Sequence, residues 1–185
     1  MKSKNILNIM KMNKAIFLDR DGTLNVDKGG FAHRLGEFEL IDGVVEGLSL
    51  LKKKFYLFII TNQSGVGLKK FTENDLKKFN GKLINELKKE KIEIKKIYYC
   101  IHKPEENCNC RKPKTKMILD AAEEFDIELK KSFMIGDKGK DVELIRNVGG
   151  RGVLVLTGHG EKFKDAECDY VAKDMLDAAK WILMQ

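Results

Sequence analysis

Proline is scarce in this chain, and long apolar runs are absent. Only two of the 185 residues are proline, and 16 glycines are spread along the length, which excludes collagen and low-complexity chains. No apolar run approaches the roughly 20 residues that a membrane-spanning helix requires. Asn8 and Lys11 interrupt the short apolar patch near the start. We therefore expect no membrane anchor, no secretion signal and a cytoplasmic location.

Cysteine is also rare, with four residues in the chain. Thiols stay reduced in the cytoplasm, so metal ligands or buried apolar groups are more consistent with these cysteines than disulfides are. Hydrophobic residues make up 43% of the sequence, which is enough to bury a core. Domains usually have about 100 to 200 residues. We therefore expect a single domain over residues 1–185, with residues 1–13 as an N-terminal extension, and a monomer.

The positive charge of the chain is concentrated in one segment. The formal net charge is +7, and residues 69–96 hold ten lysines and five acidic residues. Apolar residues in this segment recur at helical spacing, which places the lysines on a solvated face. No aromatic residues alternate with the lysines as stacking platforms for bases would. We expect no nucleic-acid partner, although a non-catalytic nucleic-acid binder stays an alternative, and the charge is compatible with an anionic substrate.

Short apolar runs alternate with helical patterns along the whole chain. The strands expected from these runs are 15–18, 55–60, 97–99, 133–135 and 153–156. The helices expected between them are 44–51, one that begins at Thr72 with Asp75 in a capping box, 117–125 and 142–148. Strands that are apolar on both faces and separated by helices indicate an α/β fold, a Rossmann-like open parallel sheet with helices on both faces.

Polar clusters follow four of these strands, at residues 19–23, 61–65, 137–141 and 157–160. In open parallel sheets, ligands bind at the carboxyl ends of the strands. Four such clusters at the same edge are difficult to explain as coincidence. We therefore expect the functional site at this edge.

The sequence DRDGTLN at residues 19–25 offers two carboxylates directly after the first strand. Asp19 is suited to be a nucleophile or metal ligand and Asp21 an acid and base, with Gly22 allowing a tight turn and Thr23 bonding its backbone. A carboxylate attacks phosphorus poorly unless a cation such as Mg²⁺ neutralises the charge. Asp137 and Asp141 can supply further oxygen ligands. A solvent-exposed Asp-Gly turn is the simpler alternative, and the glycine position excludes a calcium loop.

The residues that follow the second strand can hold a phosphate. They are Thr61, Asn62, Gln63 and Ser64. Lys112 is a candidate counter-charge for a phosphoryl group, and Arg111 can bind substrate oxygens in a bidentate manner. Lys138 is either a phosphate contact or a partner of the carboxylates. A polar loop or a helix N-cap is the alternative for the residues after the second strand.

Three cysteines and a histidine form the pattern C-x-H-x5-C-x-C at residues 100–110, namely Cys100, His102, Cys108 and Cys110. Closely spaced thiolates and an imidazole fit tetrahedral Zn²⁺, and four protein ligands leave no open position. We therefore expect a structural zinc loop that orients Arg111 and Lys112. Buried cysteines without a metal are the alternative, but the polar residues between them disfavour a core segment. No role is predicted for His33, His159 or Cys168.

DRDGTLN, TNQSG, CRKPK at 110–114 and GDKGKD at 136–141 resemble, in this order, the four motifs of haloacid-dehalogenase-superfamily phosphatases. With the cysteine cluster before CRKP, the chain is similar to the subgroup that contains heptose bisphosphate phosphatases and histidinol-phosphate phosphatases. The resemblance covers about residues 14–160. It implies a HAD-like fold, and the segments after Asn25 and Gly65 are too short for a separate cap domain.

The resemblance also implies residue roles. Asp19 would become aspartyl phosphate, and Asp21 would protonate the leaving group and activate water. Mg²⁺ would be bound by Asp19, the backbone carbonyl of Asp21, and Asp137. Thr61 and Lys112 would steady the phosphoryl group and Arg111 would help recognise the sugar. The substrate site would be completed by Asp27, Lys28, Gly29, Gly30, Thr61–Ser64 and Lys138.

The implied substrate is a small phosphorylated sugar. The run from Asn25 to Gly29 resembles the heptose enzymes more than the histidinol enzymes. We therefore expect hydrolysis of the 7-phosphate of D-glycero-D-manno-heptose 1,7-bisphosphate, in nucleotide-activated heptose biosynthesis, with histidinol phosphate as the alternative. Gly30 stands where the family usually has tyrosine, and Phe31 is a candidate replacement. Ile101 replaces the usual proline between the first two zinc ligands.

Overall fold

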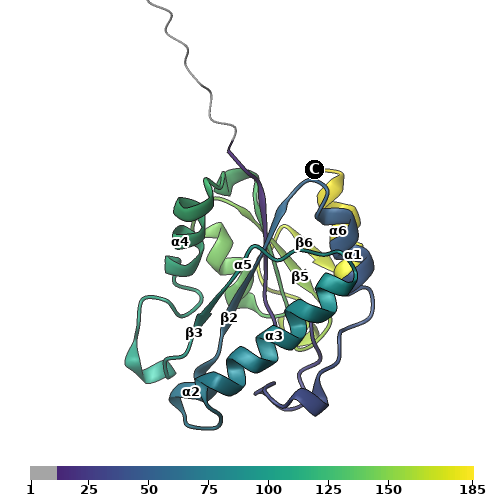
Figure 1. Cartoon of the computed structure of the whole chain (residues 1–185). Coiled ribbons are helices and arrows are strands. Elements are labelled where there is room, and N and C mark those ends of the chain that lie inside the picture. The colour runs from purple at the N-terminus through teal and green to yellow at the C-terminus, as the bar shows by residue number, and fades with distance from the viewer. Residues whose placement is uncertain (1–11) are drawn as a thin grey trace, which may run out of the picture.

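A six-stranded, fully parallel sheet forms the centre of the molecule in the computed structural model, which describes residues 12–185 (Figure 1). The strand order is β3-β2-β1-β4-β5-β6. The strands are β1 (Ala15–Leu18), β2 (Tyr56–Asn62), β3 (Lys96–Cys100), β4 (Phe133–Gly136), β5 (Arg151–Val155) and β6 (Tyr170–Ala172). The chain adds strands on one side of β1 and then crosses to the other side with β4, so the carboxyl ends of β1 and β4 meet at a topological switch point.

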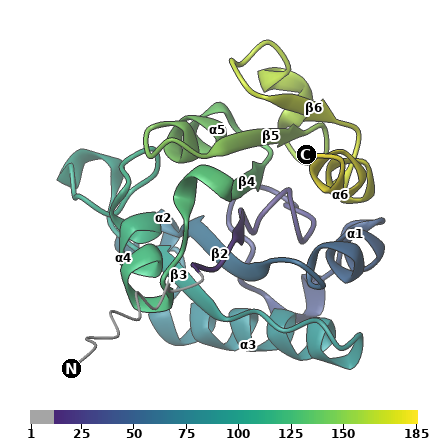
Figure 2. The same cartoon turned by 90° about the horizontal axis from the view of Figure 1, so that it is seen from above.

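Helices cover both faces of the sheet, as Figure 2 shows. One face is covered by α1 (Val44–Leu51), α3 (Glu73–Lys89) and α6 (Met175–Leu183), and the other by α4 (Lys116–Phe125) and α5 (Gly139–Arg146). A four-residue helix, α2 (Ser64–Gly67), follows β2 directly. The expected doubly covered parallel sheet is therefore confirmed.

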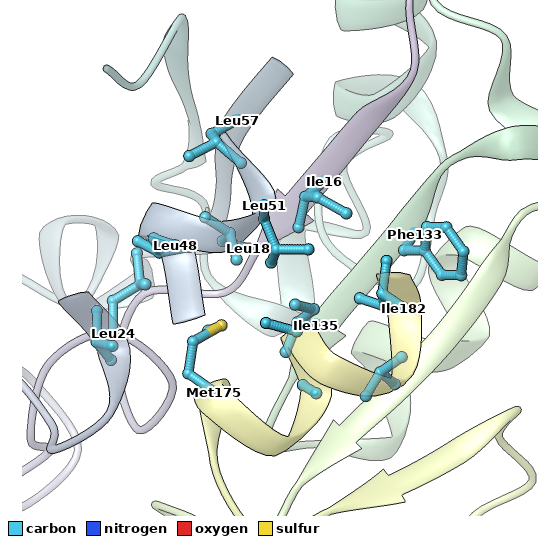
Figure 3. Close-up of a cluster of buried hydrophobic side chains, with 14 of the residues drawn as sticks. Ile16, Leu18, Leu24, Leu48, Leu51, Leu57, Phe133, Ile135, Met175 and Ile182 are labelled. Carbon is cyan, nitrogen blue, oxygen red and sulfur yellow. The ribbon is translucent and has the colours of Figure 1, made fainter. Parts of the chain in front are cut away.

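Successive side chains of β1 enter two different cores. Ile16 and Leu18 belong to the apolar cluster under α1, α3 and α6, whereas Ala15 and Phe17 belong to the cluster under α4 and α5. Figure 3 shows the first cluster, in which leucines of α1 and Met175 of α6 lie around the side chains of β1 and β4. All four β1 residues are buried because successive strand side chains point to opposite faces and both faces are covered. This burial fixes the position of Asp19, the next residue.

The expected elements agree with the structure to within a few residues. Thr72 caps α3, with its hydroxyl accepting from the Asp75 backbone and the Asp75 carboxylate accepting from the Thr72 backbone. α5 begins at Gly139, three residues before the expected start. β6 and α6 were not predicted from the sequence. β6 has three residues and only Ala172 is buried, so its apolar pattern is too short to be detected.

The N-terminal extension expected at residues 1–13 lies mostly outside the described residues. Asn13, at its end, donates from its backbone to Asp126 and from its side chain to the carbonyl of Phe125. Within residues 12–185, no helix combines the length and the apolar character that crossing a membrane demands.

The lysine-rich face of α3 is exposed, as the helical spacing predicted. Three of its lysines form ion pairs with acidic residues of the same helix, namely Lys77 with Glu73, and Lys82 and Lys89 with Glu86. These pairs neutralise part of the positive charge of this surface.

Candidate active site

Three buried carboxylates meet at the switch point of the sheet. Asp19 follows β1, Asp137 follows β4, and Asp141 lies in the first turn of α5. One oxygen of each lies within 4.8 Å of the others, and all three side chains are buried. Such a group of oxygens is the donor set that Mg²⁺ prefers.

Two glycines make room for the Asp137 carboxylate. Gly22 has φ +87° and Gly158 has φ +58°, and a Cβ on either residue would collide with Asp137 Oδ2. The turn after β1 and the turn after β5 therefore pack against each other through their backbones. The Thr157 hydroxyl donates to the carbonyl of Gly22 at 2.7 Å and joins the same two turns.

Two lysines neutralise most of the carboxylate charge. The buried Nζ of Lys112 lies 2.6 Å from Asp19 Oδ1 and 2.7 Å from Asp141 Oδ1, and it donates to the carbonyl of Ile60 at 2.7 Å. The Nζ of Lys138 lies 2.9 Å from both Asp137 oxygens and 3.4 Å from the carbonyl oxygen of Asp21. The ammonium of Lys138 therefore contacts two of the three oxygen groups implied as magnesium ligands, which shows that this position favours a cation.

Burial and charge act in opposite directions on these groups. Burial acts to raise the pKa of Asp19, but the positive charges of Lys112 and Lys138 outweigh it, so the pKa of Asp19 lies below its ordinary value. For Asp141, burial dominates and raises the pKa to about 6. Burial also raises the pKa of Asp137, to which the Asp19 charge adds. Asp19 is therefore the group of the three that is held in the ionised form a nucleophile needs.

A hydrogen-bond network that the sequence analysis missed holds Asp21. The guanidinium of Arg20 is fully buried and donates to both Asp21 oxygens, from Nε at 2.9 Å and from Nη2 at 2.8 Å. The amides of Asn25 and Gln63 donate to the same carboxylate at 3.0 and 2.8 Å. Arg20 lies between the two expected catalytic aspartates in sequence, so its place in the motif was the available signal.

One turn expectation is wrong. Thr23 was expected to hydrogen-bond the backbone of its turn through its side chain. The buried Thr23 hydroxyl has no hydrogen-bond partner among the described residues. The turn is closed instead by backbone bonds, in which the N–H groups of Leu24 and Asn25 donate to the carbonyl of Arg20.

The carboxylates open into a cavity of about 160 Å³. Most of the expected site residues line it, together with two residues for which no role was expected, Lys140 and His159. The full set is Asp19, Asp21, Asp27, Gly30, Thr61, Asn62, Ser64, Arg111, Lys112, Lys138, Lys140 and His159. The structure therefore brings residues from all four polar clusters to one place.

Three expected substrate-binding residues lie outside this lining. Lys28 and Gly29 line a neighbouring cavity of about 270 Å³. The side chain of Gln63 is buried and donates to Thr61 Oγ1 at 2.9 Å as well as to Asp21. Gln63 thus orders two other site residues. The replacement of the family tyrosine by Phe31 is also not seen in the cavity, since the Phe31 ring packs edge-on against Phe71 with centroids 6.3 Å apart.

The loop after Asp27 is fastened to the rest of the site through Asp27 and His159. Asp27 Oδ1 accepts hydrogen bonds from the backbone N–H groups of Gly29 and Gly30 at 3.2 and 2.6 Å. Asp27 Oδ2 lies 3.6 Å from Nε2 of His159, whose backbone N–H donates to Asp137 at 2.9 Å. His159 therefore links this loop to the carboxylate cluster. It belongs to the polar cluster 157–160 that the sequence analysis placed at the edge of the sheet.

The four residues of the cysteine cluster lie close together. Cys108 Sγ is 3.4 Å from Cys100 Sγ and 3.5 Å from Cys110 Sγ, and Nδ1 of His102 is 3.3 Å from Cys110 Sγ. The ligand atoms around a tetrahedral zinc are separated by about 3.8 Å when the Zn–S bonds are about 2.3 Å. The spacing of these donors and their softness fit a metal such as zinc.

The cysteine loop continues directly into two cationic residues of the cavity, because Cys110 precedes Arg111 and Lys112. The ammonium of Lys114 donates to the carbonyls of Asn107 and Cys108, and the Asn62 side chain bonds the backbone of Lys112 in both directions, at 3.0 and 3.3 Å. Lys112 therefore reaches the carboxylates from a backbone that is held on both sides.

The comparisons with known proteins agree with this geometry. Residues 109–178 match the HAD-hydrolase-like family. Over 181 residues, the chain is 39% identical to the D-glycero-beta-D-manno-heptose-1,7-bisphosphate 7-phosphatase of Haemophilus influenzae, covering 90% of this chain and 95% of the relative. The chain belongs to the heptose-1,7-bisphosphate 7-phosphatase family of HAD-like hydrolases.

Other heptose-bisphosphate phosphatases are similarly close. The D-glycero-alpha-D-manno-heptose-1,7-bisphosphate 7-phosphatase of Campylobacter jejuni is 40% identical over 153 residues, covering 82% of this chain and 87% of the relative. The D,D-heptose 1,7-bisphosphate phosphatase of B. bronchiseptica, solved with magnesium and phosphate, is 29% identical with a TM-score of 0.86, covering 92% of this chain and 98% of that one. The shared fold thus extends over the whole domain of a heptose-bisphosphate phosphatase.

Proposed function

We propose that this chain hydrolyses the 7-phosphate of D-glycero-D-manno-heptose 1,7-bisphosphate through an aspartyl phosphate on Asp19, within nucleotide-activated heptose biosynthesis. The observation that carries the mechanism is the buried Asp19 carboxylate, which Lys112 contacts at 2.6 Å and whose pKa is held below its ordinary value. The identities to both the alpha and beta enzymes support the substrate class.

The proposed reaction has two steps. Asp19 attacks phosphorus, a bond forms between its oxygen and phosphorus, and the bond from phosphorus to the sugar oxygen breaks while Asp21 delivers a proton to that oxygen. Asp21 then takes a proton from water, which attacks phosphorus and releases phosphate and the Asp19 carboxylate. Arg20, Asn25 and Gln63 hold the Asp21 carboxylate in place between these two transfers.

The residues present fit a magnesium ion, since Asp19 and Asp137 offer buried oxygens and Lys138 shows that a cation is favoured beside Asp137 and the Asp21 carbonyl. Asp19, the carbonyl of Asp21, and Asp137 would hold it. When bound, Mg²⁺ supplies charge neutralisation for the incoming phosphate. Thr61 and Lys112 hold the transferred group in this proposal.

The remaining cavity residues recognise the sugar in this proposal. Asp27, Gly30, Asn62, Ser64 and Arg111 are among the residues that line the cavity. Lys28 and Gly29 contribute through the loop after Asp27, which lines a neighbouring cavity. Gln63 contributes through its hydrogen bonds to Asp21 and Thr61.

Zinc at Cys100, His102, Cys108 and Cys110 has a structural role in this proposal. The four donors leave no open coordination position for substrate. Elemental analysis of purified protein is expected to find about one zinc per chain, and its removal lowers stability and substrate affinity without deleting the chemistry.

The test is phosphate release from both anomers of heptose 1,7-bisphosphate and from histidinol phosphate. Wild-type protein with Mg²⁺ is expected to prefer a heptose bisphosphate, and Asp19→Asn is expected to abolish release while circular dichroism stays native. Near-normal turnover by Asp19→Asn would end the covalent mechanism, and preference for histidinol phosphate would assign the alternative substrate. The cytoplasmic location and the monomeric state stay predictions, which cell fractionation and size-exclusion chromatography check.

A further inference from the structure

A buried amide interrupts the apolar face of α3, the long helix on one side of the sheet (Figure 2). Asn80 is 6% exposed and belongs to the buried side of this helix, with Leu76, Phe79, Leu83 and Leu87. Burying an amide among apolar side chains is unfavourable unless a hydrogen bond compensates for the lost contact with water. Packing alone would favour a leucine at this position, so the amide calls for a specific partner.

The partner of Asn80 is the guanidinium of Arg20. Asn80 Oδ1 accepts a hydrogen bond from Nη1 of Arg20 at 2.8 Å, and both side chains are buried. Among the described residues, Asn80 is the one acceptor that this nitrogen has. The guanidinium also lies over the ring of Phe79, with Cζ 4.7 Å from the ring centroid. Two adjacent residues of α3 therefore hold the same guanidinium, one by a polar and one by an aromatic contact.

The other two nitrogens of Arg20 hold the acid and base of the proposed function. Nε and Nη2 donate to the Asp21 carboxylate at 2.9 and 2.8 Å. Nη2 also donates to the carbonyl of Ala32 at 2.7 Å and to Gln63 Oε1 at 3.1 Å. A guanidinium is planar and its donors have a fixed geometry. Any tilt that brings Nη1 to another acceptor therefore moves Nε and Nη2 relative to Asp21.

We propose that Asn80 is a positioning residue of the phosphatase reaction, which fixes the guanidinium of Arg20 and through it directs the Asp21 carboxylate toward the leaving-group oxygen. This inference rests on the proposed function, because the contact affects the rate only if Asp21 transfers the proton. Asn80 lies 60 positions from Arg20, in a helix that carries none of the four motifs, and the sequence gave no reason to assign it a role.

Two aryl phosphates that differ in their leaving group test the role of Asn80. Phenyl phosphate releases a strongly basic phenolate, which needs a proton as its bond to phosphorus breaks. The p-nitrophenolate of p-nitrophenyl phosphate is a much weaker base and leaves readily without a proton. The value of kcat/KM reports the step in which the aryl oxygen leaves, and the ratio of the two kcat/KM values does not depend on the fraction of folded protein.

The variant Asn80→Leu keeps the approximate size of the side chain and removes the acceptor of Nη1. We expect kcat/KM for phenyl phosphate to fall roughly 10-fold and kcat/KM for p-nitrophenyl phosphate by less than about 3-fold, because part of the general-acid contribution is lost. Asn80→Ala removes the same oxygen and is expected to change the ratio in the same direction.

Two further variants make the result specific. Asn80→Asp keeps an oxygen at the place of Oδ1, and its kcat/KM for both esters is expected to stay within about 3-fold of wild type. Asn85→Leu makes the same change as Asn80→Leu at an exposed position of α3, and it is expected to leave both esters unaffected.

Equal losses on both esters in Asn80→Leu and Asn80→Ala would give Asn80 a purely structural role and overturn the inference, as would unchanged kinetics. An Asp21→Asn protein with the wild-type ratio of the two kcat/KM values would instead remove Asp21 as the acid and overturn the proposed mechanism. Wild-type protein that cleaves neither ester would also count against that mechanism, because attack on phosphorus by Asp19 does not require the sugar. The inference thus fails on the Asn80 variants alone, whereas the proposed function fails on the wild type or on Asp21→Asn.

Discussion

Replacing Lys112 by methionine tests the electrostatic balance of the site most directly. The buried ammonium of Lys112 contacts Asp19 at 2.6 Å and Asp141 at 2.7 Å, and it donates to the carbonyl of Ile60 at 2.7 Å. The cluster of three carboxylates and two ammonium groups, Asp19, Asp137, Asp141, Lys112 and Lys138, carries a formal charge of −1. Lys112→Met changes it to −2 and leaves two buried carboxylate oxygens without their partner.

Removing one partner of a buried ion pair destabilises a protein by about 3 to 5 kcal/mol. For a chain of this size, 1 kcal/mol corresponds to roughly 2 to 4 °C in Tm, so Lys112→Met is expected to lower Tm by roughly 6 to 20 °C. Urea unfolding followed by circular dichroism, at pH 7.5 without added Mg²⁺, measures the decrease in the free energy of unfolding. Lys116→Met is the matched control, because the ion pair of Lys116 with Asp120 is exposed to solvent and contributes little to stability.

A double variant separates charge from packing. Lys112→Met with Asp141→Asn returns the formal charge of the cluster to −1, so it is expected to be more stable than Lys112→Met alone. Added Mg²⁺ is expected to restore part of the stability of Lys112→Met, since it supplies positive charge beside the same oxygens. A Lys112→Met protein within 1 kcal/mol of wild type, or a double variant less stable than the single one, would refute this reasoning.

Three further predictions concern other parts of the site. Arg20→Met removes both guanidinium hydrogen bonds to Asp21. In steady-state assays, we expect kcat to fall roughly 10- to 100-fold with little change in KM. An unchanged kcat would contradict a positioning role for Arg20. Gly22→Ala forces a side chain into Asp137 at φ +87° and is expected to lower the free energy of unfolding by about 1 to 3 kcal/mol, measured in urea. Zinc affinity is expected to rise with pH, because burial raises the pKa of Cys100 to about 12 and metal binding displaces the thiol proton. Chelator competition measures this affinity, and equal values at pH 6 and pH 8 would exclude a coupling between zinc binding and deprotonation of Cys100.

Local pattern predicted most of the fold. The strand 15–18 appears as β1 without a change in bounds, because four consecutive apolar residues followed by an aspartate describe a buried strand with one polar end. The capping box of Thr72 and Asp75 is likewise confirmed, since it depends on residues three positions apart. By contrast, β6 exists because β5 offers it an edge to pair with, and that edge is not visible in the three residues of β6 themselves.

The candidate site also has a part that local sequence pattern predicted and a part that depends on the tertiary structure. The identity of the acidic residues and of the four cysteine-cluster residues followed from short motifs. The distant partners of Arg20 did not, because Gln63 and Asn80, which accept hydrogen bonds from its guanidinium, are 43 and 60 positions away from it. The place of His159 beside Asp27 also depends on two loops that follow different strands.

The sequence by itself determined which chemical groups are available, because nucleophile, acid, cations and soft metal ligands are properties of side chains and their local spacing. Only the tertiary structure decided which of these groups face one cavity and which of them form ion pairs there. Lys138 and Lys140 have the same side chain two positions apart, but one lies against Asp137 and the other has no partner among the described residues. The packing of the turns after β1 and β4 against each other also brings the carbonyl of Asp21, 117 positions away, within 3.4 Å of the Lys138 ammonium, a contact that no local pattern in the sequence specifies.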